Sequence, residues 1–121
     1  MKLSVMELLR LLMIVNNWPA RNVGTMAMMI RLGDILELTA DEKEQIGFRE
    51  AIVNGQASYT WNPNAPELER EFTARQKRTL LGAIQNPPEG LPWTRADKLT
   101  FLSLLEKLGG ELPKEDDDED S

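Results

Sequence analysis

Residues 3–15 read LSVMELLRLLMIV and form the most apolar stretch of the chain. Ser4, followed three residues later by Glu7, is a capping box, so we expect a helix over residues 4–16. Apolar side chains occupy nearly its whole circumference, and such a helix is either central in the core or partly covered by a partner. The second alternative predicts a homodimer with residues 4–15, and Met28 from the next helix, near the interface.

The same stretch is too short to span a bilayer, and Glu7 and Arg10 interrupt it, so we expect no membrane insertion. It also differs from a signal peptide, because Asn16, Asn17 and Trp18 follow it where small residues would precede a cleavage site. The sequence therefore predicts a cytoplasmic protein.

Two more helices are expected before residue 48. The second runs from Asn22 or Thr25 to Leu36. Its expected apolar face comprises Val23, Met26, Met29, Ile30 and Gly33. A capping box at Thr39 starts a short third helix, and Gly47 ends that helix.

Residues 48–61 read FREAIVNGQASYTW and predict a β-hairpin. Asn54-Gly55 is a strong signal for its two-residue turn, because a type I′ turn needs positive φ at both positions. Residues 62–71 contain two prolines and are expected to form a loop.

Two helices follow that loop. A capping box at Thr73 starts the fourth helix, which ends near Gln85, and Thr94 starts the fifth, which ends at Gly109-Gly110. The expected apolar stripe of the fifth helix is Leu99, Leu102, Leu105 and Leu108. The chain is therefore predicted to be α+β and helix-dominated, with three helices, a β-hairpin and two further helices in one compact domain over residues 1–113.

The excess of acidic residues is concentrated at the C-terminal end of the chain. The net charge of the 121 residues is −6, and residues 114–121 read KEDDDEDS. Runs of like charge at a chain end are usually disordered. We therefore predict a disordered acidic tail over residues 114–121, which is either solubilising or an imitation of a nucleic-acid backbone.

The composition excludes several classes of enzyme. The chain has no cysteine and no histidine, so it cannot form a Ser-His-Asp or Cys-His site, a disulfide or a zinc finger. The glycine-rich phosphate-binding motifs and the nucleophile elbow are also absent. We therefore expect a protein that is not an enzyme and that uses no cofactor and no metal.

Five side chains are candidates for contact with a protein partner: Trp18, Trp61, Trp93, Met28 and Met29. Tryptophan is enriched at binding hot spots, and methionine adapts to irregular surfaces. The alternative interpretation is that the tryptophans cover the rims of the core and the methionines fill gaps within it.

Nucleic-acid association is the alternative to protein binding. Three helices and a hairpin follow each other in the order of a winged helix, but the segment ADEKEQIG, in place of the reading helix, is acidic and would repel phosphates. The clustered bases are Arg70, Arg75, Lys77 and Arg78. They are predicted to form either a solvated helix face or a small patch for phosphate or acidic groups around Arg75, while the tail offers mimicry of nucleic acid.

Residues 36–61 resemble a segment of small proteins encoded in phage and prophage genomes. In that segment an L-x-L-T-x-E-E-K-type helix start leads to I/L-G-F and then to a hairpin that ends in Trp. The matching residues are Leu36, Leu38, Thr39, Glu42, Lys43, Ile46, Gly47, Phe48 and Trp61. The resemblance implies a phage origin, and hence the host cytosol, but no activity. The resulting hypothesis is a small non-enzymatic phage-type protein that acts through protein–protein contact, as a regulator or inhibitor of a host protein or as an assembly accessory.

Deleting residues 114–121 should leave the melting temperature nearly unchanged. The segment has no apolar side chain to bury, and ordering its backbone would cost roughly 1–2 kcal/mol per residue. Thermal unfolding followed by circular dichroism compares the two chains, and a clearly lower melting temperature without the tail would contradict the expectation.

Overall fold

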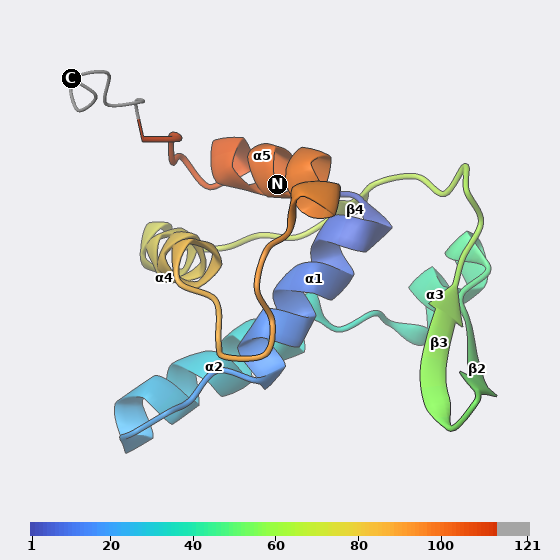
Figure 1. Cartoon of the computed structure of the whole chain (residues 1–121), viewed down its shortest axis with the longest axis horizontal. Helices are drawn as coiled ribbons and strands as arrows, with labels where there is room; N and C mark the ends of the chain where they lie inside the picture. The colour runs from blue at the N-terminus through green and yellow to red at the C-terminus, as the bar shows by residue number, and fades with distance from the viewer. Residues whose placement is uncertain (114–121) are drawn as a thin grey trace.

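The computed structural model describes residues 1–113, and the predicted acidic tail lies outside these residues. The elements in chain order are β1 (Lys2–Leu3), α1 (Val5–Asn16), α2 (Val23–Leu36), α3 (Ala40–Ile46), β2 (Arg49–Val53), β3 (Gln56–Thr60), β4 (Leu68–Glu69), α4 (Ala74–Gln85), the 3₁₀ turn η1 (Arg95–Asp97) and α5 (Lys98–Lys107) (Figure 1). The predicted helix-dominated α+β architecture is therefore confirmed.

Short polar side chains place the starts of α1, α3 and α4. Ser4, Thr39 and Thr73 each accept a hydrogen bond from the backbone N–H three residues later. The side chain of that later residue accepts one in return from the N–H of the capping residue. These capping boxes satisfy N–H groups that have no partner within a helix, and all three were predicted.

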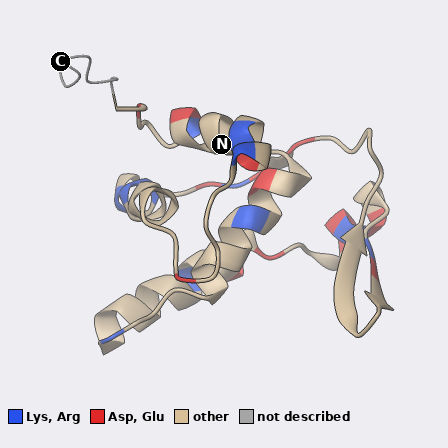
Figure 2. Ribbon diagram, in the orientation of Figure 1, with Lys and Arg blue, Asp and Glu red and all other residues tan. Residues whose placement is uncertain are grey.

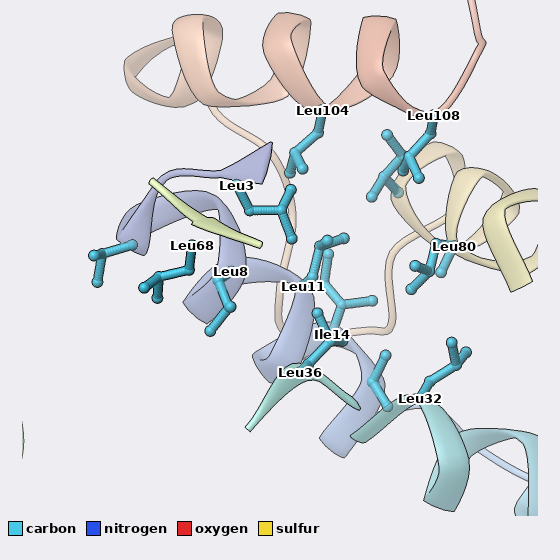
Figure 3. Close-up of a cluster of buried hydrophobic side chains, with 14 of the residues drawn as sticks. Leu3, Leu8, Leu11, Ile14, Leu32, Leu36, Leu68, Leu80, Leu104 and Leu108 are labelled. Carbon is cyan, nitrogen blue, oxygen red and sulfur yellow. The ribbon is translucent and has the colours of Figure 1, made fainter. Parts of the chain in front are cut away.

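The helix α1 lies at the centre of the fold, with α2, α4, α5 and β1 packed around it. Its Leu8, Leu11 and Ile14 are fully buried, and leucines from the surrounding elements converge on them (Figure 3). The core position therefore accounts for most of the apolar circumference of α1. Its two methionines, Met6 and Met13, remain about half exposed.

One strand pair was missed by the sequence analysis. Leu68–Glu69, inside the predicted loop, pairs antiparallel with Lys2–Leu3, with Leu3 opposite Leu68 and both leucines buried. Strands of two residues are too short to show a period of two in hydrophobicity. The pair joins the start of the chain to the segment that leads into α4.

The predicted apolar face of α2 is wrong in part. Met29 and Gly33 are buried as expected, but the rest of the buried face is Leu32 and Leu36. Val23, Met26 and Ile30 are 85%, 51% and 52% exposed, respectively. The physical reason is that the buried face follows Met29, Leu32, Gly33 and Leu36, which leaves Ile30 to one side of it. No residue of α2 before Met29 is buried, and this start of the helix projects at the lower left of Figure 1.

The last helix also differs from its prediction. The segment after Thr94 begins with one 3₁₀ turn, and α5 proper starts at Lys98. The altered start turns Leu99 outward, where it is 80% exposed, and the buried residues are Leu104, Leu105 and Leu108.

The predicted hairpin is confirmed, with Arg49 opposite Thr60 and Val53 opposite Gln56. Asn54 and Gly55 have φ values of 53° and 79°, as a type I′ turn requires. All ten strand residues are exposed, so the hairpin stands away from the core.

A buried ion pair ties α1 to α5. Glu7 is 3% exposed, and the Lys107 ammonium donates to its Oε1 at 2.7 Å and to Glu67 at 3.2 Å. Burial alone would raise the pKa of Glu7, but hydrogen bonds from Lys107, Ser103 and the Ser4 backbone outweigh it and hold the pKa below its ordinary value of 4.5. Burial likewise opposes the charge of Lys107, yet its two carboxylate partners raise its pKa above 10.5.

Lys107→Met should lower the free energy of unfolding by about 3–5 kcal/mol, because it leaves the buried Glu7 carboxylate without its cation.

The native pair contributes stability above pH 4.5, and this contribution is lost as the pH falls through the lowered pKa of Glu7. The contribution of Lys107 is present below pH 10.5 and is lost as the pH rises through its raised pKa. Urea unfolding at pH values across these two ranges measures the loss of free energy of unfolding at low pH and at high pH. Lys98→Met, at an exposed lysine without an ion pair in residues 1–113, is the matched control.

Gly55→Val should destabilise the turn by about 1–2 kcal/mol, because a β-branched residue resists positive φ. Since the strands are exposed, we expect the loss as faster amide hydrogen exchange across residues 49–60, with little change in the melting temperature. Unchanged exchange there would argue against the turn geometry.

Candidate interaction surface

The base of the hairpin is fixed to α3. Gly47 ends α3 in the left-handed conformation with φ 66°, and the N–H of Phe48 donates to Lys43 O at 2.9 Å. On the other strand the N–H of Asn62 donates to Ile46 O at 2.7 Å. Both strands therefore leave the body at defined points.

One face of the hairpin is more apolar than the other. The register places Glu50 opposite Tyr59 and Ile52 opposite Ala57, so these four side chains share a face. The Tyr59 ring stacks on Phe48, with ring centroids 5.6 Å apart. Tyr59 and Glu50 also line a hollow shared with α1, so this face is the one turned toward α1.

Two hollows follow the outward side of α1. The first, of about 330 Å³, lies between the second half of α1, the start of α3 and the hairpin base. The second, of about 220 Å³, lies between the first half of α1, Trp61 and Trp93. Both are lined by Leu9, Met13 and Tyr59, so they adjoin and form one depression, which we name the α1–hairpin groove.

Arg10 holds one end of this groove in place. Its Nη2 donates to the carbonyl oxygens of Leu91 and Pro92 at 3.1 and 3.0 Å, and its guanidinium lies 4.3 Å from the centre of the Trp93 ring. The indole N–H of Trp93 donates to Ile84 O at 2.7 Å. The Trp93 ring is therefore fixed at the groove wall before any ligand arrives.

The predicted partner-binding residues fall into two groups. Trp61 and Trp93 line the α1–hairpin groove. Trp18, Met28 and Met29 line a separate hollow of about 340 Å³, between the start of α2 and α4. The five residues do not form one surface, and each of them also packs at least partly against the core.

The predicted basic cluster is also divided. Arg70 makes a two-pronged ion pair with Glu42, with both N–O distances 2.6 Å, and donates to Glu37 O at 3.0 Å. Its guanidinium lowers the pKa of Glu42. Arg70 therefore ties the β4 segment to α3. Arg75 lines the hollow beside Trp18, and Lys77 and Arg78 share α4 with it (Figure 2).

Sequence reasoning missed Phe48 and Tyr59 of the groove, whereas Met6, Leu9 and Met13 fall within residues 4–15, which it predicted to lie near a homodimer interface. The excess of apolar residues in the first helix was the signal for these three. Their position opposite the hairpin was not deducible, because it depends on how α3 directs the hairpin base.

Two classes of site are not found in the described part of the chain. No group of three or more acidic side chains there is placed to hold a metal ion. No helix of residues 1–113 has both the length and the apolar character needed to cross a bilayer.

Comparisons with protein-family models, curated proteins and solved structures gave no match. The resemblance of residues 36–61 to phage-encoded proteins therefore stays a prediction.

Proposed function

We propose that the chain is a non-enzymatic binding protein that takes up an extended, apolar segment of a partner protein along the α1–hairpin groove. The observation that carries this proposal is the joint presence of the groove and an unpaired strand edge beside it. In residues 1–113 the hairpin is a sheet of two strands only, with no strand beside the outer edge of β3.

The edge of β3 has the properties of a strand acceptor. Residues 56–60 read QASYT, with no charge and no proline to block pairing. Val53 and Gln56 flank the two-residue turn and form a hydrogen-bonded pair. Hydrogen-bonded and non-hydrogen-bonded pairs alternate along an antiparallel ladder, so the N–H and C=O groups of Ala57 and Tyr59 point outward, away from β2. A segment added here would gain main-chain hydrogen bonds, and its alternate side chains would reach the groove.

The lining of the groove is mostly apolar and favours apolar side chains, with the carboxyl groups of Glu37, Glu50 and Asp97 also along it. Its cations are engaged, since Arg10 lies over Trp93 and the Lys43 ammonium lies 5.9 Å from the centre of the Phe48 ring. Trp61, Trp93 and two half-exposed methionines supply the contact area. Large fixed aromatics beside adaptable methionines are typical of binding hot spots.

The resemblance to phage-encoded proteins supports a role for this contact in a host cell. In that setting the chain regulates or inhibits a host protein, or assists an assembly, in the cytosol. A partner bound through backbone pairing and a shallow apolar groove suits this role, because it needs no catalytic group.

Selection of displayed peptides on the full chain tests the proposal. We expect enrichment of extended peptides with apolar residues at alternate positions, whose binding shifts the amide resonances of Ala57 and Tyr59. Ala57→Pro, which removes an outward N–H, and Met13→Lys, which places a charge in the groove, should each weaken binding at least tenfold.

Leu99→Lys, at an exposed leucine of α5 outside the groove, is the matched control and should bind as the unaltered chain does. Enriched peptides that shift resonances of α4, or that bind Ala57→Pro and Met13→Lys unchanged, would refute the groove as the site.

One observation favours nucleic-acid binding as a second candidate function. The helix α4 carries Arg75, Lys77 and Arg78 without any acidic residue, and none of the three forms an ion pair within residues 1–113. Binding to generic duplex DNA that falls steeply with salt, and that Arg75→Glu abolishes, would support it. Mimicry by the acidic tail concerns residues outside the described chain.

A further inference from the structure

The outer face of α2 has an apolar stripe that nothing in the described chain covers. Val23, Met26 and Ile30 are each more than half exposed. In Figure 2 the projecting half of this helix shows no charged residue. A helix face of this kind usually packs against another helix.

The spacing along this face matches a helix–helix seam. Val23, Ala27, Ile30 and Asp34 succeed each other at intervals of four, three and four residues, which places them on one line along the helix. Small Ala27 stands beside large Ile30 at the middle of the line. Two such seams interlock when the large residue of one meets the small residue of the other.

The charges at the ends of α2 oppose its own dipole. A helix is stabilised by acidic residues near its N-terminus and by basic residues near its C-terminus. The first turn of α2 has no acidic residue and its last turn no basic residue. Instead Arg21 precedes the helix, while Asp34 lies in its last turn, and neither forms an ion pair in residues 1–113. Arg21 and Asp34 are therefore placed unfavourably for an isolated helix.

We infer that α2 packs antiparallel against α2 of a second copy of this chain, about a twofold axis that passes between Ala27 and Ile30. In this register Val23 of one copy lies level with Asp34 of the other, and Ile30 lies level with Ala27. The two ends of the seam are about 16 Å apart along the helix. Each Asp34 carboxylate then lies near the N-terminus of the facing helix and its Arg21, so the charges that oppose one dipole complement the other.

A hollow beside the seam fits a side chain from the second copy. It measures about 240 Å³ and is lined by Met26, Ile30, Gly33 and Asp34 of α2, with Val15 and Trp18 behind them. Helical side chains lean toward the N-terminus of their own helix. Met26 of an antiparallel second copy therefore leans toward Gly33, where the missing side chain leaves the hollow open.

The charge pattern favours a second copy over an unrelated helix. Arg21 and Asp34 lie at opposite ends of the same apolar stripe, so the face is complementary to itself when reversed. The hollow beside the seam shares Asn16 and Glu37 with the α1–hairpin groove, but Arg21, Ile30 and Asp34 do not line the groove. Variants at these three positions therefore test dimer formation without altering the groove lining.

Sedimentation equilibrium of the full chain tests the inference. We expect a dimer of twice 13.7 kDa, and Ile30→Asp should raise its dissociation constant about 100-fold or more, because a carboxylate would be buried without a partner. Leu99→Asp is the control, since Leu99 is as exposed as the stripe but lies on α5. Both positions are exposed, so circular dichroism should show intact folds.

Charge reversal gives a second, more specific readout. Arg21→Asp alone faces two carboxylates toward each other, and Asp34→Arg alone faces two cations, so each variant should dimerise more weakly. In an equimolar mixture of the two variants every contact becomes an opposite-charge pair, and the mixed dimer should form more tightly than either variant alone. A wild-type monomer at millimolar concentration, equal effects of Ile30→Asp and Leu99→Asp, or a mixture no tighter than its components would each overturn the inference.

Discussion

Burial of α1 is the constraint that places the other elements. Because its apolar side chains point in nearly every direction, its neighbours approach from several sides: β1, α2, α4 and α5. The hairpin and α2 expose several apolar side chains, because the hairpin stands away from α1 and α2 packs on it with one face only. Met6 and Met13 of α1 and Leu99 of α5 are exposed as well. Both proposed contact surfaces therefore follow from one cause, the limited amount of chain available to surround a central helix.

The polar residues inside the apolar stretch of α1 serve as long-range ties. Glu7 binds Lys107 at the end of α5, and Arg10 binds the carbonyl oxygens of the connector before η1. A buried charge costs free energy unless it is paired, so each of these residues accepts only a limited set of positions for its partner. The two residues that exclude a membrane helix at the level of sequence thus define how α5 and residues 91–93 sit against α1.

The capping boxes and the hairpin turn were predicted correctly from the sequence, whereas pairings and burial that depend on tertiary packing were not. The three capping boxes and the Asn54-Gly55 turn act within four residues, so their geometry is present in the sequence itself. The β1–β4 pair joins residues far apart in the chain, and its two-residue strands have no pattern. The outward position of Leu99 depends on a single 3₁₀ turn. The tryptophans were predicted from the sequence as candidate contact residues. That Trp61 and Trp93 line one hollow and Trp18 another was not predictable, because it depends on how α4 and the hairpin sit against α1.

The separation in sequence between α1 and its partners has a consequence for folding. The first helix is complete by residue 16, yet Leu3 pairs with Leu68, and Glu7 meets its cation 100 residues later. The helix α2 follows α1 directly and covers one side of it, whereas α4 and α5 cover its other sides only after much more of the chain has been made. Contacts between residues so far apart in the sequence slow folding and leave apolar surface exposed in the unfinished chain. The sides of α1 that face α4 and α5 therefore stay exposed longer during folding than the side that α2 covers.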